Sequence, residues 1–182
     1  MDNGASSYRR FLAGDDDGLV EIIRDYKDGL MLYLNSFVRN IDTAEDLAEE
    51  TFVKIVIKKP KYNGKSSFKT WLYAIGRNVA LDYLRLNQKN DLQAEVIQNA
   101  DEESLEKAYI IKENKIILHH AIKKLKPEYR QVLWLTYFED FSNKETAKVM
   151  KKSVHSIETL IYRARNALKT ELEKEGFTYE DL

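Results

Sequence analysis

Basic and aromatic side chains are interleaved along residues 61–85, a combination suited to capturing unpaired nucleic-acid bases. Aromatic rings can stack on bases while cations follow the phosphates. Taking a base out of a duplex costs a few kcal/mol, which stacking and hydrogen bonds must return; Asn63 and Ser66 can supply the hydrogen bonds. Phe68 and Trp71 are more typical of a hydrophobic core. The basic members of the segment are Lys61, Lys65, Lys69, Arg77 and Arg85, and the aromatic members are Tyr62, Phe68, Trp71, Tyr73 and Tyr83.

Charge is segregated along the chain, although its net charge is only -1. Residues 1–53 carry 12 acidic and 5 basic side chains, whereas residues 54–89 carry 9 basic side chains and the single acid Asp82. Such a basic block can neutralise phosphates and release counterions. A solvated lysine-rich face is the simpler alternative, but the interleaved aromatic side chains favour nucleic-acid binding.

Residues 142–168 have the pattern of a helix-turn-helix, in which the second helix reads base edges in the major groove. Ser142 and Glu145 form a capping-box pattern, and Ser153 can cap the second helix. Apolar residues fall at i, i+4, i+7 and i+11 from Ile157. An ordinary helical hairpin is the alternative. The side chains expected nearest the bases are Ser153, His155, Ser156 and Thr159, and those expected near phosphates are Lys144, Lys148, Arg163 and Arg165.

A third candidate site is a helix that is acidic at its start and basic at its end. This order complements the helix dipole, which explains part of the pattern. The acidic group still leaves a patch able to dock a basic surface on a partner protein. The acidic residues are Glu45, Asp46, Glu49 and Glu50, followed by Lys54, Lys58 and Lys59.

Helices must position these sites, because Gly (7) and Pro (2) are too scarce for many hairpins. Apolar spacing predicts one helix over about residues 19–37 and another over about residues 68–86. Between them, a helix should begin at Asp42 or Thr43, where Thr43 and Asp46 resemble a capping box, and should end before Pro60. The basic, turn-rich residues 61–67 are predicted to form a loop.

The residue pattern of the second half of the chain predicts a separate helical domain. Residues 87–103 are polar and become acidic, which is typical of a flexible linker. A long helix is predicted from near Ser104 to Leu125, and Pro127 suits the first turn of the next helix. The predicted fold class is therefore all-α, with two small helical domains joined by a flexible linker, the second containing the helix-turn-helix.

The residues predict neither enzyme chemistry nor a cofactor. The absence of cysteine excludes disulfides, thiolate metal sites and a Cys nucleophile. The adjacent His119 and His120 point to different faces of a helix, and HExxH, GxSxG and phosphate-binding glycine motifs are missing. No signal peptide and no apolar run of about 20 residues is present. We therefore expect a cytoplasmic protein that is not an enzyme and has no metal, no cofactor and no membrane insertion.

Three motifs together resemble one protein family. Residues 44–54 (AEDLAEETFVK), 68–78 (FKTWLYAIGRN) and 125–133 (LKPEYRQVL), followed by the helix-turn-helix and residues 162–165 (YRAR), closely resemble the extracytoplasmic-function (ECF) branch of the sigma-70 family of RNA polymerase sigma factors. The resemblance extends over about residues 8–172, with the motifs in the family's order.

The resemblance implies a transcription initiation factor that binds core RNA polymerase, through the clamp helices of the largest subunit and the flap, and directs it to promoters. Residues 1–87 would bind polymerase and recognise and open the -10 element. Residues 88–104 would be the linker, and residues 105–182 would read the -35 element as duplex DNA. Compact members of the family are often held inactive by an anti-sigma protein, which is a further partner to consider.

Matching positions define three sets of candidate site residues. The polymerase-binding set is Asp46, Glu49, Glu50 and Phe52. The -10 set is Lys61, Tyr62, Asn63, Lys65, Ser66, Lys69, Arg77, Asn78 and Arg85. The -35 set is Lys144, Ser153, His155, Ser156, Glu158, Thr159, Tyr162, Arg163 and Arg165.

Three residues depart from the family's pattern. Relatives usually have glycine in the helix-turn-helix turn, where this chain has Lys151, and Glu158 and Leu160 occupy positions that are often basic. Glu158 is instead hypothesised to accept a hydrogen bond from a cytosine amino group. The leading alternative is a stand-alone helix-turn-helix regulator that binds two-fold symmetric duplex half-sites as a dimer. The basic loop with its aromatic residues argues against that alternative.

Overall fold

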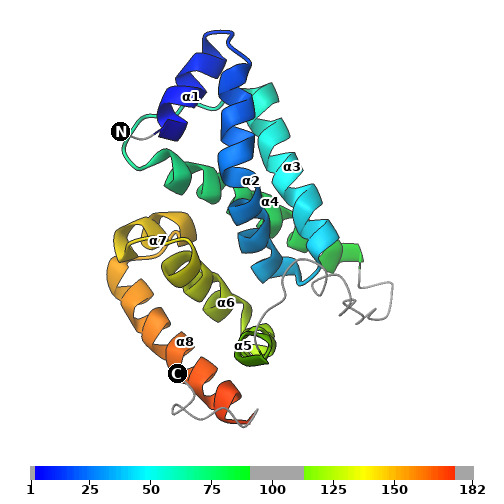
Figure 1. Ribbon diagram of the computed structural model, residues 1–182, viewed down its shortest axis with the longest axis vertical. Coiled ribbons are helices and arrows are strands. Elements are labelled where there is room, and N and C mark those ends of the chain that lie inside the picture. Colours follow the sequence, from blue (N-terminus) through cyan, green and yellow to red (C-terminus); the bar gives the residue numbers. More distant parts are fainter. Residues whose placement is uncertain (1–2, 91–112, 175–182) are drawn as a thin grey trace.

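A computed structural model describes residues 3–90 and 113–174, and within these ranges the chain is helical and contains no β-strand. The all-α prediction is confirmed, with one helical group formed by α1 to α4 and a second formed by α5 to α8 (Figure 1). The elements are α1 (Asn3–Leu12), α2 (Asp17–Val38), α3 (Ile41–Lys58), α4 (Phe68–Asn90), α5 (Glu113–Lys124), α6 (Pro127–Leu133), a π-helical turn η3 (Trp134–Phe138), α7 (Asn143–Met150) and α8 (Val154–Lys174).

The first helical group is built on the pair α2 and α3, with α4 packed across both. Apolar residues recurring every three or four positions place one stripe of each helix in a common core. Ile22 and Leu30 of α2, Ile55 of α3 and Leu72 of α4 are fully buried. This core positions the acidic start of α3 and the basic loop before α4.

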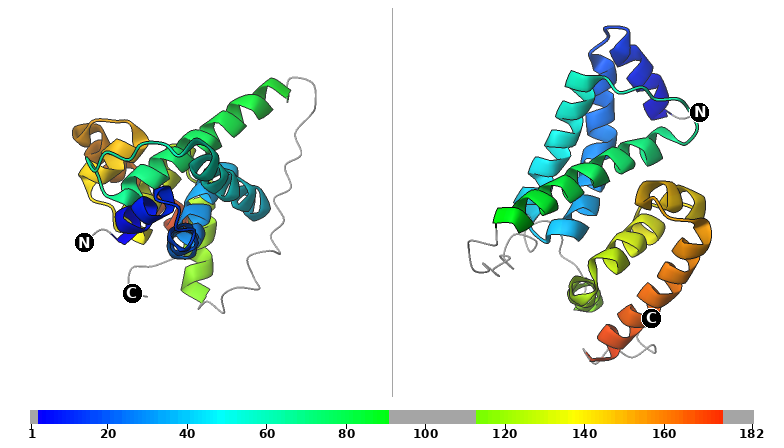
Figure 2. Two further views of the ribbon diagram at one scale, coloured as in Figure 1. Left: turned by 90° about the horizontal axis from the view of Figure 1, so that it is seen from above. Right: turned by 180° about the vertical axis from the view of Figure 1, so that it is seen from behind.

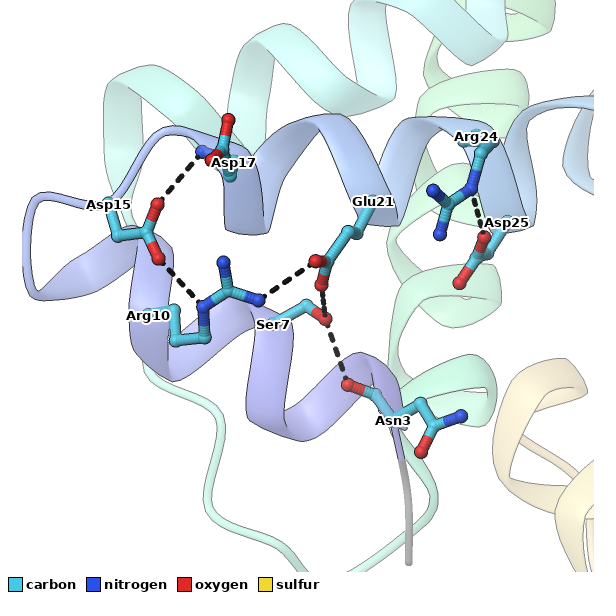
Figure 3. Close-up of polar contacts among 8 residues, drawn as sticks. All are labelled: Asn3, Ser7, Arg10, Asp15, Asp17, Glu21, Arg24 and Asp25. Atoms are coloured by element: carbon cyan, nitrogen blue, oxygen red, sulfur yellow. Dashed lines mark hydrogen bonds and ion pairs between the residues drawn. The ribbon is translucent and has the colours of Figure 1, made fainter.

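Helix α1 is fastened to α2 by a polar network around Arg10 (Figure 3). Arg10 pairs with Asp15 (2.7 Å) and Glu21 (2.8 Å), and the Ser7 hydroxyl donates to Glu21 (2.6 Å). Hydrogen bonds from Ser7 and Arg10 hold the pKa of Glu21 below its ordinary value. A Cβ on Gly18 would clash with the Ser7 carbonyl oxygen, so the two helices approach backbone to backbone at this glycine.

Helix α3 begins earlier than predicted and ends where predicted. The side chain of Asn40 accepts a hydrogen bond from the Thr43 amide (2.8 Å), so Asn40 is the N-cap and the predicted capping box of Thr43 with Asp46 is wrong. Both residues lie inside the helix. At the other end, Lys59 adopts a left-handed conformation (φ 41°) immediately before Pro60. Proline disfavours helical geometry in the preceding residue, which explains this boundary.

The second helical group contains a π-helical turn that apolar spacing did not predict. Pro127 occupies the first turn of α6, as predicted. After α6 the chain widens into η3, and the Glu139 amide donates to the Trp134 carbonyl (3.1 Å). The Phe141 amide then donates to the Leu135 carbonyl (2.9 Å). A π turn shifts the register of the side chains that follow it, and here Glu139 and Phe141 come to face α4.

The two helical groups pack against each other, α4 against α7 and α2 against α6 (Figure 2). Their buried residues form one continuous hydrophobic cluster. At the contact, Arg130 is only 6% exposed and donates to the carbonyl oxygens of Ser36 (2.9 Å) and Leu125. Burial and the nearby Arg39 lower the pKa of Arg130 to about 10, so it stays charged at neutral pH. The carbonyl groups at the end of α2 favour this cation.

Several predicted segments fall partly or wholly outside the described residues. The predicted linker, 88–104, overlaps the last three residues of α4, and the rest of it lies beyond the described range, as do the start of the predicted long helix and the C-terminal residues 175–182. Among the described helices, none combines the length and the apolar character that crossing a membrane requires.

Candidate nucleic-acid and protein-binding surfaces

An aromatic cluster supports the basic loop that joins α3 to α4. Phe68, the first residue of α4, is fully buried at its centre. The rings of Tyr8, Tyr26, Tyr62 and Trp71 lie with centroids between 5.3 and 5.7 Å from the Phe68 ring. Phe68 is therefore a core residue, as its pattern suggested, and Trp71 packs beside it.

Hydrogen bonds fix the path of the basic loop, residues 59–67. The Tyr8 hydroxyl of α1 donates to the Pro60 carbonyl (2.7 Å), and the Tyr62 hydroxyl donates to the Ser66 carbonyl (2.5 Å). The Asn63 side chain accepts from the Lys65 amide (3.0 Å), which closes an Asx turn. The conformation of the loop is thus fixed by a hydrogen bond from α1 and by hydrogen bonds of its own side chains. The side chains of Lys61, Asn63 and Lys65 are exposed to solvent.

The remaining residues of the -10 set lie along α4 and differ in exposure. Arg85 is exposed and pairs with Asp82 (3.0 Å), whereas Arg77 is half-buried. Lys69 and Asn78 are also half-buried because they contact the second helical group. The basic loop and α4 therefore carry the predicted set between them, and the second group contacts Lys69 and Asn78.

Helix α3 presents the predicted acidic patch together with an apolar extension. Asp46, Glu49 and Glu50 are exposed, whereas Phe52 is 5% exposed and lies in the core beneath them. Sequence reasoning missed Val53 (50% exposed) and Ile57 (73% exposed), which continue the same face. The spacing 46, 49, 50, 53, 57 is helical and could have identified this face. We name residues 46, 49, 50, 53 and 57 the α3 face.

The helix-turn-helix has the predicted caps. The Ser142 hydroxyl accepts from the Glu145 amide (3.3 Å), and the Glu145 carboxylate accepts from the Ser142 amide (3.1 Å), which confirms the capping box. Ser153 accepts from the Ser156 amide (3.1 Å) at the start of α8. Between the helices Lys151 is left-handed (φ 54°), the conformation that explains why a glycine suits this turn.

Nearly all of the -35 set is exposed, on α8 itself, on α7 (Lys144) or in the turn between them (Ser153). Thr159 is half-buried, and Leu160 is only 9% exposed, so it packs inside the domain and does not face solvent where a phosphate would lie. Tyr162 is 68% exposed. The exposed members of the set are Lys144, Ser153, His155, Ser156, Glu158, Tyr162, Arg163 and Arg165.

A shallow pocket of about 370 Å³ lies between η3 and α8. Glu158, Tyr162 and Arg165 line one side of it, and Tyr137 and Phe141 line the other. Tyr137 is 53% exposed. The sequence did not identify this pocket, because its two sides come from separate elements that only the tertiary structure brings together.

Loss of the Ser142 cap should destabilise the second helical group by about 1 kcal/mol. Burial alone would raise the pKa of Glu145, but hydrogen bonds from Ser142, Ser67 and Thr70 hold it below its ordinary value. A lowered carboxyl pKa contributes stability above the unfolded-state pKa, and this contribution disappears as pH falls through the folded-state pKa. Urea unfolding of Ser142→Ala should therefore show a deficit at neutral pH that shrinks in acid. A deficit that is constant with pH would contradict this account.

Two family models match the chain: sigma-70 region 2 over residues 22–90 and sigma-70 region 4 over residues 115–168. The chain is 30% identical over 171 residues to the ECF RNA polymerase sigma factor SigW of Bacillus subtilis, an alignment that covers 87% of this chain and 91% of SigW. It is also 30% identical over 175 residues to the RNA polymerase sigma-H factor of Pseudomonas aeruginosa, covering 90% and 91% of the two chains.

Solved structures share the fold at lower identity. The sigma factor RpoE of Bartonella quintana, solved in complex with the anti-sigma factor NepR, matches with a TM-score of 0.72 at 22% identity, over 87% of this chain and 98% of RpoE. CnrH, solved in complex with the cytosolic domain of CnrY, matches with a TM-score of 0.64 at 21% identity, over 94% and 96% of the chains. These likenesses bear on the fold alone.

Proposed function

Because this chain belongs to the extracytoplasmic-function branch of the sigma-70 family, we propose that its three surfaces divide the work of promoter-specific transcription initiation. The α3 face would bind core RNA polymerase, the basic loop with α4 would capture the opened -10 strand, and α8 would read the -35 duplex. The protein would do no bond chemistry itself and would need neither metal nor cofactor. The observation that carries this proposal is that the folded chain presents an exposed acidic face, a supported basic loop and an exposed recognition helix.

The α3 face combines the two properties of a protein-docking surface. Its three carboxylates can steer a basic partner surface by charge. The exposed side chains of Val53 and Ile57 add apolar area at the same face, and apolar area at the centre of an interface supplies affinity. Phe52 is buried and would contribute indirectly, by packing α3 against the core so that the exposed residues of the α3 face keep their positions. We propose that this face binds the clamp helices of the largest polymerase subunit. The second domain would bind the flap of the polymerase.

The basic loop is suited to holding opened DNA because it is presented in a fixed conformation. Ordering a mobile loop on binding costs free energy, and a preformed loop avoids that cost. Lys61 and Lys65 can follow the backbone, and Asn63 can donate to a flipped base from its amide nitrogen. The ring of Tyr62, half-buried against Phe68 and Trp71, supplies a stacking surface at the base of the loop.

The domain boundaries proposed from sequence remain consistent with these assignments. Residues 1–87 contain the α3 face, the basic loop and nearly all of α4. Residues 105–182 contain the helix-turn-helix. The matches to family regions over 22–90 and 115–168 support this proposed division. Helix α1 lies before the first matched region and serves this chain by anchoring Pro60.

Replacing Glu158 with glutamine should alter the base preference at one -35 position. A glutamate carboxylate accepts from a cytosine amino group, whereas a glutamine amide prefers adenine, and each such pairing is worth about 1–3 kcal/mol. Glu158 is exposed on α8, so the substitution should leave folding intact. Selection of -35 sequences from a randomised promoter library would measure the preference. An unchanged base preference at every -35 position would show that Glu158 does not contact a base.

The proposal also includes an inhibitory protein partner. RpoE of Bartonella quintana, which shares this fold, was solved bound to an anti-sigma factor. The apolar part of the α3 face and the pocket beside α8 are the surfaces that such a partner would cover, since both expose aromatic or aliphatic side chains.

Run-off transcription tests the function directly. Purified core polymerase and this protein would be mixed with a library of promoter fragments. Specific transcripts that require the protein and share -10 and -35 elements would support the proposal. No transcript, together with no binding to core polymerase, would favour the alternative of a stand-alone helix-turn-helix regulator. That alternative predicts a dimer on two-fold symmetric half-sites.

A further inference from the structure

We propose that Asn63, followed by Gly64 at the tip of the basic loop, is a site of spontaneous deamidation whose product weakens the capture of opened DNA. The chemical step is a property of the folded chain and can be measured without polymerase or promoter. Its consequence for DNA rests on the proposed function, because that function assigns Asn63 to the -10 set.

Deamidation at an Asn-Gly pair needs only the side-chain amide, the next backbone nitrogen and water. The Gly64 nitrogen attacks the Asn63 side-chain carbon Cγ, and the amide nitrogen Nδ2 leaves with the Gly64 proton as ammonia, which closes a succinimide ring. Water then adds across one of the two C–N bonds of the ring. Opening at Cγ gives aspartate, and opening at the main-chain carbonyl carbon gives isoaspartate, which has an additional methylene in the backbone.

The sequence contains two Asn-Gly pairs, Asn3 with Gly4 and Asn63 with Gly64. A glycine in the second position has no side chain to hinder attack by its nitrogen, and its backbone adopts conformations that other residues avoid. The two pairs are therefore equivalent on sequence alone. The structure places them in different surroundings and favours reaction at the second.

The first pair is held in helix α1. Asn3 is the first residue of the helix, and the Ser7 hydroxyl donates to its carbonyl oxygen (3.1 Å), which restrains the peptide group that must rotate. Gly4 is buried, and a Cβ there would clash with the Phe68 ring. The first turn of α1 must therefore open before the succinimide can close, so the fold should slow the reaction at Asn3.

The second pair lies at the tip of the basic loop. Asn63 and Gly64 are exposed, and among the described residues none beyond the chain neighbours of Gly64 has an atom within 4 Å of a Cβ at this position. Gly64 already has a positive φ (70°), in the region that glycine adopts readily. Within residues 3–90 and 113–174, neither the Asn63 carbonyl nor the Gly64 amide takes part in a hydrogen bond. The peptide group between them can thus rotate without breaking packing contacts or main-chain hydrogen bonds.

One hydrogen bond opposes the reaction, and the aspartate product can form it again. Asn63 Oδ1 accepts from the Lys65 amide (3.0 Å), and the side chain must rotate away from this position before Cγ is attacked. A hydrogen bond contributes about 1 kcal/mol, so the reactive conformation is populated roughly fivefold less than in a free chain. Aspartate forms the same type of turn as asparagine. The aspartate form therefore keeps the turn while its charge changes.

The added carboxylate would stand among the cations that follow the DNA backbone. Lys61 and Lys65, two exposed lysines of the loop, flank Asn63 in the sequence. A negative charge there repels phosphates and competes with them for the lysines. Deamidation also removes the amide donor that would contact a flipped base. We expect the combined change to weaken binding of single-stranded DNA on the order of tenfold at low salt.

Peptide mass spectrometry of the full chain during incubation at mildly alkaline pH tests the chemical step. Conversion of Asn3 and Asn63 would be followed in the folded chain and in urea, where each pair reacts at its intrinsic rate. Asn63 should convert in the folded chain within about fivefold of its rate in urea. Asn3 should convert more than about tenfold more slowly in the folded chain than in urea. Equal ratios of folded to urea rate at the two pairs, or a lower ratio at Asn63, would overturn the proposed site.

Fluorescence anisotropy with a mixed-sequence single-stranded oligonucleotide tests the consequence for DNA. Asn63→Asp should bind on the order of tenfold more weakly than Asn3→Asp, the matched control, which makes the same change at the other pair. The difference should shrink as salt screens the added charge. The parent should lose affinity during incubation in proportion to Asn63 conversion. Asn63→Gln, whose longer side chain cannot close the five-membered ring, should keep its starting affinity.

Equal oligonucleotide affinities in Asn63→Asp and Asn3→Asp would overturn the link to DNA capture. An equal loss of affinity in the incubated parent and in incubated Asn63→Gln would overturn it as well. Failure of the proposed function would look different. Asn63 would convert and oligonucleotide affinity would fall as described, but fresh protein with Asn63 intact would give no promoter-specific transcript with core polymerase.

Discussion

Replacing Asp46 and Glu49 with lysine is expected to abolish binding to core RNA polymerase, a loss of more than about 100-fold in affinity. Both carboxylates are exposed on the α3 face, where a basic partner surface would meet two cations in place of two anions. Like charges brought together at an interface cost several kcal/mol and slow association as well. Binding of labelled protein to purified core polymerase would measure the loss.

The same double variant should remain folded. Glu49 lies 3.4 Å from Lys27, an exposed pair whose removal costs at most about 1 kcal/mol. Lys27 keeps its shorter contact with Glu45 (2.8 Å). The matched control is the pair Glu128→Lys and Glu173→Lys, which makes the same charge change at exposed sites of the second helical group. Unaltered polymerase affinity in Asp46→Lys/Glu49→Lys would count against the assignment of the α3 face.

Replacing Phe68 with alanine is expected to lower the free energy of unfolding by about 3–5 kcal/mol. Phe68 is fully buried, and four aromatic rings surround it. Removing the ring leaves a cavity that these rigid neighbours cannot fill, and the loss exceeds the transfer free energy of the side chain alone. Urea denaturation monitored by circular dichroism would measure the change.

Phe138→Ala is the control for Phe68→Ala. Its ring is stacked on Trp134 but is 49% exposed, so its removal should cost less than about 1.5 kcal/mol. A loss below about 1 kcal/mol in Phe68→Ala would show that the aromatic cluster relaxes around the cavity. If the cluster supports the basic loop as described, Phe68→Ala should also weaken single-stranded DNA binding under conditions where the protein is still folded.

The helices and several of their ends could be predicted from the sequence because local rules determine them. Apolar spacing predicted α2, α3, α4 and α8, and Pro60 and Pro127 marked a helix end and a helix start. The capping box of Ser142 with Glu145 involves residues three positions apart, so its hydrogen bonds need no tertiary partner. The charge segregation that indicated nucleic-acid binding is likewise a property of composition along the chain.

The sequence-based predictions were wrong or incomplete where two residues could each cap the same helix, and where an α-helix changed to a π-helix. Asn40 and Thr43 are both acceptable N-caps, and the structure selects Asn40. The π turn at residues 134–138 leaves no mark in apolar spacing, yet it determines where Glu139 and Phe141 point. Burial of Phe52 and Leu160 also depends on how the helices pack, since either side chain fits a surface or a core on spacing alone.

The contact between the two helical groups was decided by tertiary structure alone. Glu139 meets Lys69 across 70 residues, and Lys148 meets Lys65 across 83. No local pattern links such positions, because their approach depends on the packing of α4 against α7 and on Gly29, whose missing side chain leaves room for the Glu139 carboxylate. Which residues bind polymerase and DNA is thus a prediction that rests on the sequence. Only the folded chain decides which of them are free, because a cation already paired with a carboxylate must lose that partner before it can bind a phosphate.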